Sequence, residues 1–262
     1  MKQQLNTALF TPLEYATSLT CWWSQAGLDY NVQENSTSWL ELGVRNVSDI
    51  PNNTKRHAKL RVTTRDSSLD NIEVNKEAWP QSIVAFQNAI AAGAKLPGNS
   101  YSVKSAVAIG PQYAALMVIY DLPDADEIEA GKVASGKSGR LLYNMLKAAG
   151  FLPEECFITS LASSRPAVGE LPPSDTVNLA EFMRHQIGLV RPKRILILGS
   201  AACQALLNAD LMSSRGNLAN INHDDEVIDT VVTFHPRTLL MQPNMKAQAW
   251  GDLQKLITEA TL

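Results

Sequence analysis

The sequence has few cysteines and no long apolar run. Its three cysteines, Cys21, Cys156 and Cys203, lie far apart and form no C-x-x-C motif. A sparse and odd set of cysteines excludes a disulfide framework and fits a reducing compartment, so a cytoplasmic location is expected. No stretch stays apolar for the roughly 18 residues that a membrane-spanning helix needs, so no membrane association is expected.

An excess of basic charge is also missing. The chain carries 23 Lys and Arg against 26 Asp and Glu, a net charge of -3. Bulk electrostatics therefore does not indicate nucleic-acid binding, although a local basic patch could still bind phosphates. Hydrophobic residues make up 45% of the 262 residues, which is enough for the core of a globular protein.

Short apolar runs alternate with helical periodicity in the C-terminal part of the chain. Strands are predicted at 114–120, 156–162, 194–198 and 229–234. Helices are predicted at 138–150, 178–190, 201–207 and 245–259. Strands that alternate with helices indicate an α/β fold, here a three-layer α/β/α sandwich with a four-stranded, mainly parallel sheet.

The first hundred residues have a different pattern. Helical periodicity at 12–27 and 76–94 flanks a polar stretch at 46–70 that is typical of a loop. We therefore expect a mostly helical N-terminal extension, residues 1–105, and an α/β domain, residues 106–262.

Polar residues follow each predicted strand. Asp121, Arg165, Ser200 and His235 come after the first, second, third and fourth strand, respectively. Ligands of open parallel sheets bind beyond the carboxyl ends of the strands. These side chains are therefore expected to gather at one edge of the sheet.

The segments around these residues share their order and spacing with a known family. They include MVIYDLPDADE, GKVASGKSGRLLYNMLKAAGF, CFITSLASSRP and TFHPRTLLMQP. Over residues 114–255 the chain resembles the uracil-DNA glycosylase superfamily, closest to its family 4 type. The resemblance implies an enzyme of base-excision repair that hydrolyses the N-glycosidic bond of a damaged or deaminated base. DNA is the implied partner, and a repair or replication protein is a further one.

The resemblance also implies roles for individual residues. Asp121 would position the attacking water, and His235 would donate to the pyrimidine oxygen as negative charge develops on the leaving base. The implied lining of the base site is Pro123, Ala134, Ser160 and Arg165. The implied DNA contacts are Gly136, Lys137, Ser138, Ser200, Arg237, Leu239 and Leu240, the two leucines wedging into the duplex. Capping roles for Asp121 and His235, and simple burial of the leucines, stay open as alternatives.

Several positions depart from the family pattern. Ala134 stands in place of a stacking Phe, Ser160 in place of an Asn, and Tyr120 and Asp124 in place of glycines. Uracil excision should therefore be weak, and a larger base could use space beside Ala134. A catalytically degenerate module that binds DNA or a protein partner is the alternative.

The cysteine positions of the family's iron-sulfur cluster are also changed. They fall at Ser164 and Leu179, and three scattered cysteines cannot build a four-cysteine cluster. We therefore expect no iron-sulfur cluster and no other cofactor.

Residues 131–138 match the P-loop pattern G-x-x-x-x-G-K-S. A P-loop needs a strand that runs directly into its first glycine, and here an acidic stretch, 126–130, precedes it. A nucleotide-hydrolysing enzyme is therefore the least favoured alternative, and Lys137 is expected on the surface of a helix.

Overall fold

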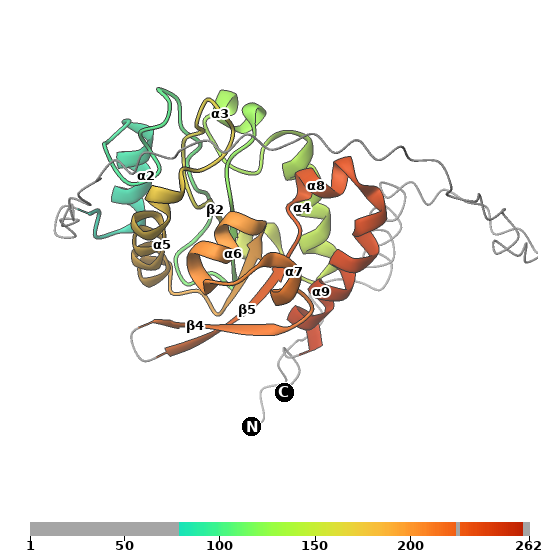
Figure 1. Ribbon diagram of the computed structural model, residues 1–262. Coiled ribbons are helices and arrows are strands. Elements are labelled where there is room, and N and C mark those ends of the chain that lie inside the picture. Colours follow the sequence, from blue (N-terminus) through green and yellow to red (C-terminus); the bar gives the residue numbers. More distant parts are fainter. Residues whose placement is uncertain (1–78, 224–225, 259–262) are drawn as a thin grey trace, which may run out of the picture. The chain divides into compact units, whose positions relative to one another are not determined.

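The structure, a computed structural model, describes residues 79–223 and 226–258 (Figure 1). Its strands are β1 (Leu116–Tyr120), β2 (Cys156–Ser160), β3 (Arg194–Leu198), β4 (Leu218–His223) and β5 (Glu226–Thr233). Its α-helices are α2 (Ile83–Ala91), α3 (Ala125–Ala130), α4 (Gly136–Ala148), α5 (Thr176–Val190), α6 (Ser200–Leu207), α7 (Leu211–Ser214), α8 (Pro236–Met241) and α9 (Lys246–Thr258). Short 3₁₀ turns are η3 (Pro153–Glu155), η4 (Pro173–Asp175) and η5 (Pro243–Met245).

The five strands form one sheet in the order β2-β1-β3-β5-β4. The four predicted strands all pair in parallel, whereas β4 pairs antiparallel with β5 at the edge. The strand β4 was not predicted, because Ile221 is its only buried residue and the strand has no apolar run. An exposed edge strand of this kind lacks the signal that predicts a buried parallel strand.

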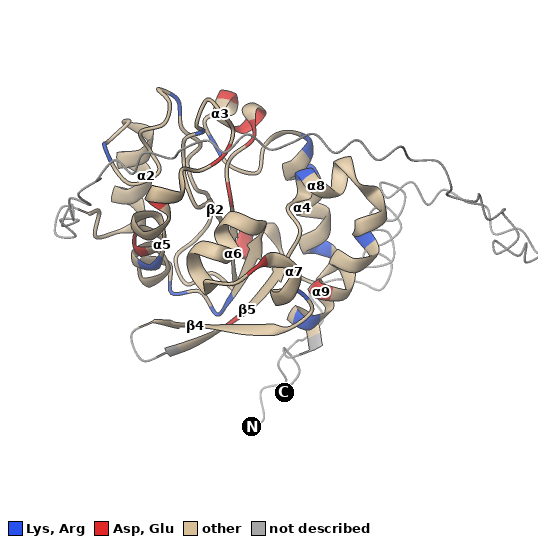
Figure 2. Ribbon diagram, in the orientation of Figure 1, with Lys and Arg blue, Asp and Glu red and all other residues tan. Residues whose placement is uncertain are grey.

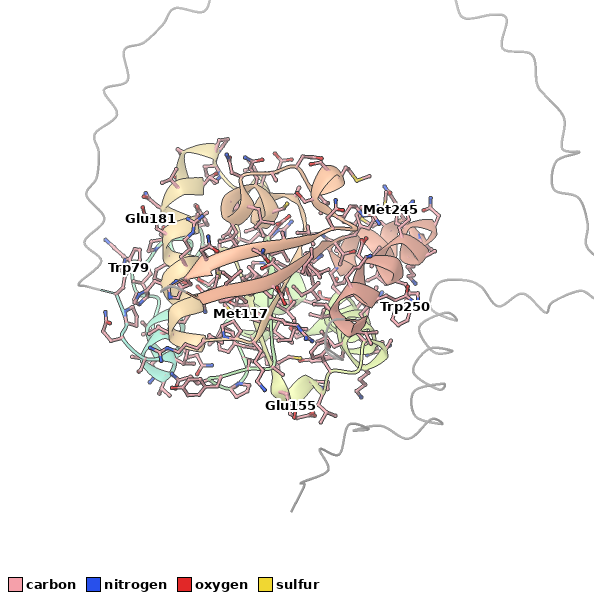
Figure 3. All side chains as sticks on the ribbon, turned by 90° about the horizontal axis from the view of Figure 1, so that it is seen from below. Trp79, Met117, Glu155, Glu181, Met245 and Trp250 are labelled. Carbon is pink, nitrogen blue, oxygen red and sulfur yellow. The ribbon has the colours of Figure 1, made fainter. Side chains whose placement is uncertain are left out.

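Helices cover both faces of the sheet, which confirms the three-layer α/β/α architecture. The helices α5 and α6 lie over one face, with α2 beside α5. The helices α4, α8 and α9 lie over the other face (Figure 1). In a second view, Trp79 and Glu181 lie to one side of the sheet and Met245 and Trp250 to the other (Figure 3).

The second predicted helix is confirmed in shortened form as α2. The Ser82 hydroxyl accepts from the backbone N–H of Ala85 and so caps its first turn. The ring of Phe86 stacks on Phe182 of α5 at 5.3 Å between centroids, which fixes α2 on the α/β core. The predicted helix at 12–27 and the polar stretch at 46–70 lie outside the described residues, and the domain boundary at residue 106 stays a prediction. Across the part of the chain that the structure describes, no helix is long and apolar enough to cross a membrane.

Candidate active site

The carboxyl ends of the four parallel strands lie level with one another. Tyr120, the last residue of β1, pairs with Ser160 of β2 and with Leu198 of β3, which in turn pairs with Thr233 of β5. Asp121, Ser200 and His235 follow these strand ends by one or two residues. The predicted gathering of polar residues at one sheet edge is therefore found.

Asp121 lies against the N-terminus of α6. Its Oδ1 accepts from the backbone N–H of Ala202 at 2.6 Å. Gly199 makes this approach possible, because a Cβ at that position would overlap the Asp121 carboxylate. Burial raises the pKa of Asp121, while hydrogen bonds from the N-terminal amides of α6 oppose the rise. The capping role that stood as an alternative for Asp121 is thus present.

His235 caps the helix α8 with one ring nitrogen and leaves the other without a partner. Its Nδ1 accepts from the backbone N–H of Arg237 at 3.0 Å, so the ring proton of the neutral form lies on Nε2. Within the described residues, this buried Nε2 has no hydrogen-bond partner. Burial, together with the nearby Arg237 charge, lowers the pKa of His235 to about 4. The side chain is therefore a neutral, preoriented hydrogen-bond donor at neutral pH.

Next to His235, a closed network holds the side chain of Tyr120. The Tyr120 hydroxyl donates to Glu127 Oε1 at 2.8 Å and accepts from the Ala134 N–H at 3.2 Å. Glu127 also accepts from the N–H groups of Ala134 and Asp124. Burial raises the pKa of Glu127 to about 7. Every polar group in this network has a partner inside the protein.

Two further contacts tie together the loops around the site. Arg237 of α8 donates to Asp124, whose second oxygen accepts from the Ser138 hydroxyl at the start of α4. Arg165 donates to the carbonyl oxygen of Pro123 at 3.0 Å. The loop after β1 is thus bound to α4, α8 and the loop after β2.

The cavity beside His235 is small. A cavity lined by Tyr120, Glu127, Ser138, Gly139, Leu142, His235 and Pro236 measures only about 10 Å³. Gly139 packs so closely on the loop that a Cβ would overlap the Ala134 carbonyl group. Ser160 is buried, and its hydroxyl donates to the Ala162 carbonyl at 2.8 Å. Use of space beside Ala134 by a larger base stays a prediction.

The two leucines of α8 differ in their surroundings. Leu239 is 0% exposed and belongs to the core beneath α8, so it does not fit the predicted role of a wedge. Leu240 and Met241 are 40% and 76% exposed. The exposed apolar tip of α8 is therefore Leu240 and Met241.

The N-terminus of α4 does not form a P-loop. The residues before it form the helix α3 and not a strand, and Asp126 packs on Gly136. With Asp124 bound to Ser138, carboxylates occupy the place that a phosphate would need. Lys137 is exposed on α4, as predicted. The predicted phosphate contacts of Gly136 and Ser138 do not fit this arrangement, whereas Lys137 and Ser200 remain accessible.

Charges of opposite sign flank the site (Figure 2). The helix α3 exposes Asp126 and Glu129, whereas α4 and α8 carry Lys137, Arg140 and Arg237. A polyanion would therefore be attracted to the α4 and α8 side.

The residues at the two cluster positions do not fit an iron-sulfur cluster. The Ser164 hydroxyl donates to the Gly98 carbonyl and accepts from the Tyr101 N–H. Leu179 is buried among apolar side chains of α5 and its neighbours. Neither offers the thiolate sulfur that cluster iron requires.

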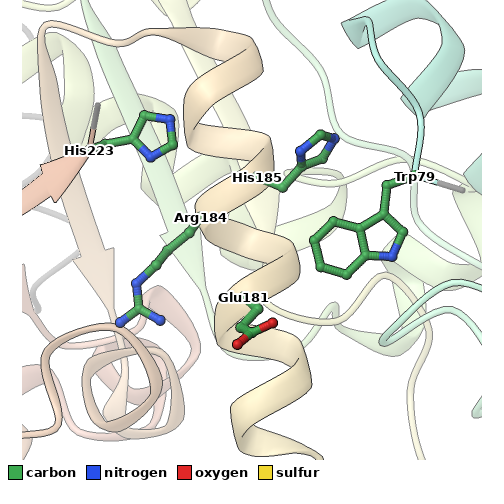
Figure 4. A pocket seen from close by; sticks show the side chains of 5 residues that line it. All are labelled: Trp79, Glu181, Arg184, His185 and His223. Atoms are coloured by element: carbon green, nitrogen blue, oxygen red, sulfur yellow. The ribbon is translucent and has the colours of Figure 1, made fainter. Parts of the chain in front are cut away.

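A wider cavity of about 330 Å³ lies on α5 and away from this edge. It is lined by Trp79, Glu181, Arg184, His185 and His223 (Figure 4). His185 is held in place by the Pro80 carbonyl oxygen, at 2.7 Å from its Nε2. None of the site residues predicted from the sequence lines this cavity.

Comparison with known proteins assigns the family. The family model for the uracil DNA glycosylase superfamily matches residues 108–254, which is more than half of the chain. The chain belongs to this superfamily. The match includes the whole sheet and every residue described above at its carboxyl edge.

Three members of the superfamily illustrate the similarity. The Type-4 uracil-DNA glycosylase of Pyrobaculum aerophilum is 27% identical over 173 residues, 61% of this chain and 85% of that protein. The Type-4 enzyme of Archaeoglobus fulgidus is 23% identical over 155 residues, 56% of this chain and 78% of its own. The Type-4 enzyme of Thermotoga maritima is 29% identical over 141 residues, 52% of this chain and 69% of its own.

The role of Glu127 at this edge was not predicted from the sequence. A signal was available, because Asp124 and Glu127 have the D-x-x-E spacing of a capping box, which starts α3. The contacts of Glu127 with Tyr120 and Ala134 had no such signal, since they depend on how β1, α3 and the loop before α4 pack together.

Proposed function

We propose that the protein is a DNA glycosylase that hydrolyses the N-glycosidic bond of a damaged or deaminated base in base-excision repair. The observation that carries this proposal is the buried, neutral His235, which holds an unused N–H donor at the carboxyl edge of the sheet. Membership of the superfamily and the names of the Type-4 relatives support the same class of reaction.

His235 would stabilise the leaving base. When the glycosidic bond breaks, its electron pair stays on the base and negative charge develops on the pyrimidine oxygen. An N–H donor that is already oriented and shielded from water stabilises that charge strongly. Because the pKa of His235 is about 4, the ring is neutral at neutral pH, and it donates a hydrogen bond to the base without transferring a proton.

Asp121 would act on the water and the sugar. Its Oδ1 accepts from the Ala202 N–H, and in this proposal Oδ2 orients the attacking water molecule. Burial raises its pKa and makes it a better hydrogen-bond acceptor for that water. The same negative charge would stabilise the oxocarbenium-like sugar as the base departs.

DNA would approach over the α4 and α8 side of the edge. Lys137 and Ser200 are accessible for phosphate contacts there, and Arg237 is partly exposed beside its ion pair with Asp124. A repair or replication protein partner and a cytoplasmic site of action are further parts of this proposal. Binding to DNA should weaken with salt, because phosphate contacts release counterions.

The test is a panel of labelled oligonucleotides that carry uracil, hypoxanthine, xanthine and mismatches, assayed for abasic sites in single and double strands. Asp121→Asn keeps an acceptor for the Ala202 N–H, so we expect it to stay folded and to lose most of the excision activity. Absence of excision on every substrate, with DNA binding intact, would favour the catalytically degenerate alternative.

A further inference from the structure

The side chain of Tyr120 fills the space directly beside the unused donor of His235. The two rings lie 5.2 Å apart between centroids and stand nearly perpendicular, at 87°. Tyr120 is 2% exposed although it ends a strand at the edge of the sheet where ligands bind.

The ring cannot swing away without breaking hydrogen bonds. Its hydroxyl is fixed from two sides, by the Glu127 carboxylate and by the Ala134 N–H. Glu127 is itself held by the Asp124 N–H. The tyrosine therefore behaves as a fixed part of the wall and not as a surface side chain.

The remaining space beside His235 is too small for a base. The cavity there measures about 10 Å³, which is room for at most one water molecule. Pockets for small organic ligands are typically about 300 Å³ or more. A water could satisfy the Nε2–H, but a pyrimidine carbonyl cannot reach it while the Tyr120 ring is in place.

We infer that Tyr120 is the specificity-determining residue of this site: its ring closes the base pocket in front of His235 and excludes uracil from it. The inference rests on the proposed function, because it assigns the His235 donor to a base. Among the residues that line the cavity beside His235, Tyr120 is the one whose aromatic ring contacts the His235 ring. Removing that ring should therefore open a pocket that ends on the His235 N–H.

The experiment compares Tyr120→Gly and Tyr120→Val, which remove the ring, with Tyr120→Phe, which keeps it. Leu146→Ala serves as the matched control, because Leu146 is buried in the same cluster but does not line the cavity beside His235. Free uracil is the probe. Its binding is measured by calorimetry and by the NMR resonances of the His235 ring, and excision is measured on a single-stranded uracil oligonucleotide. Thermal melting identifies which variants are folded.

We expect Tyr120→Gly and Tyr120→Val to bind uracil and to shift the His235 resonances. Wild type, Tyr120→Phe and Leu146→Ala should do neither. Excision by Tyr120→Gly should exceed that of wild type by about tenfold or more, the gain expected from one restored hydrogen bond to the base. A folded Tyr120→Gly or Tyr120→Val that fails to bind uracil overturns the inference, as does uracil binding of equal strength by wild type.

The outcomes also separate this inference from the proposed function. Uracil binding by the opened variants without excision of any base would support the role of Tyr120 and count against the glycosylase. Equal uracil excision by wild type and Tyr120→Gly would support the glycosylase and overturn the role of Tyr120. If neither ring-deleted variant folds, wild type and Tyr120→Phe decide: binding by either contradicts the inference, and failure of both to bind supports it.

Discussion

The two sides of the carboxyl edge differ in how their polar groups are satisfied. On the β5 and α8 side, His235 keeps a buried N–H without a partner among the described residues. On the β1, α3 and α4 side, Tyr120, Glu127 and Ala134 satisfy one another. An unpaired buried polar group costs about 1–3 kcal/mol, so proteins rarely keep one without a ligand or a water for it. The first side is therefore organised for a ligand, and the second for its own stability.

The largest effect should follow from removing the unpaired donor. In the Tyr120→Gly background, where the pocket is open to uracil, His235→Ala should lower uracil excision by roughly 10²–10³-fold, the loss typical of one preoriented donor to a developing negative charge. DNA binding, measured by fluorescence anisotropy, should stay close to that of wild type. His185→Ala is the control, because His185 is a partly buried histidine that lies on α5, away from the site, and is hydrogen-bonded to Pro80. Excision that survives His235→Ala would remove His235 from the site.

On the same side, the buried Leu239 and the exposed Met241 of α8 should respond differently to substitution. Leu239→Ala should lower the free energy of unfolding by about 2–5 kcal/mol, because it deletes a core side chain. Met241→Ala should change that free energy by no more than about 0.5 kcal/mol, because the side chain is exposed.

We expect Met241→Ala to reduce excision from duplex DNA more than from single strands, since a wedge matters only where a base must be flipped. Equal losses on both substrates would argue against a wedge at this tip.

Sequence reasoning predicted the parts of the molecule that depend on local pattern. The strands β1, β2, β3 and β5 are buried apolar runs, and their parallel order brings Asp121 and His235 to one edge. The edge strand β4 lacks such a run and was missed. The start of α8 has a local signal, since Pro236 at its first position fits a helix N-terminus and His235 caps it.

Whether the space at the site is open or filled by side chains could not be predicted from local pattern. Tyr120 was recognised as a departure from a glycine, but its hydroxyl is bound by residues 7 and 14 positions away, on two different elements. Gly139 packs against the backbone of Ala134, a contact that no local pattern predicts. Whether a substitution opens or fills a pocket depends on such tertiary contacts, which a strand or helix pattern does not contain.

The pH dependence of stability should separate the two sides. His235 has a pKa of about 4 in the folded protein against an ordinary 6.5, so its contribution is complete above pH 6.5 and is lost as the pH falls toward 4. Glu127 has a pKa of about 7 against an ordinary 4.5, so its contribution is complete below pH 4.5 and is lost as the pH rises toward 7. Each contribution is at most about 3 kcal/mol, and the two oppose each other between pH 4.5 and 6.5.

Two variants should reveal these opposing slopes. Glu127→Gln leaves the contribution of His235, so its free energy of unfolding should rise from pH 4.5 to 6.5. His235→Gln leaves the contribution of Glu127, so its free energy of unfolding should fall over the same range. Wild type should be flatter than either variant in urea titrations at a series of pH values. Slopes of the same sign in both variants would contradict the assigned pKa shifts.

The smallest effect concerns the backbone at Ala134, on the β1, α3 and α4 side. Ala134 has a φ of 55°, a left-handed conformation that costs a residue with a Cβ roughly 1–2 kcal/mol. Ala134→Gly removes that cost, while the greater freedom of glycine in the unfolded chain returns about 0.4–1 kcal/mol of it. The free energy of unfolding should therefore rise by up to about 1 kcal/mol. The matched control is Ala89→Gly in α2, which should lower it by about 1 kcal/mol, because there the backbone is helical. A loss of stability in Ala134→Gly would mean that the Ala134 methyl group is needed for packing, and that the Glu127 and Tyr120 contacts do not hold this loop on their own.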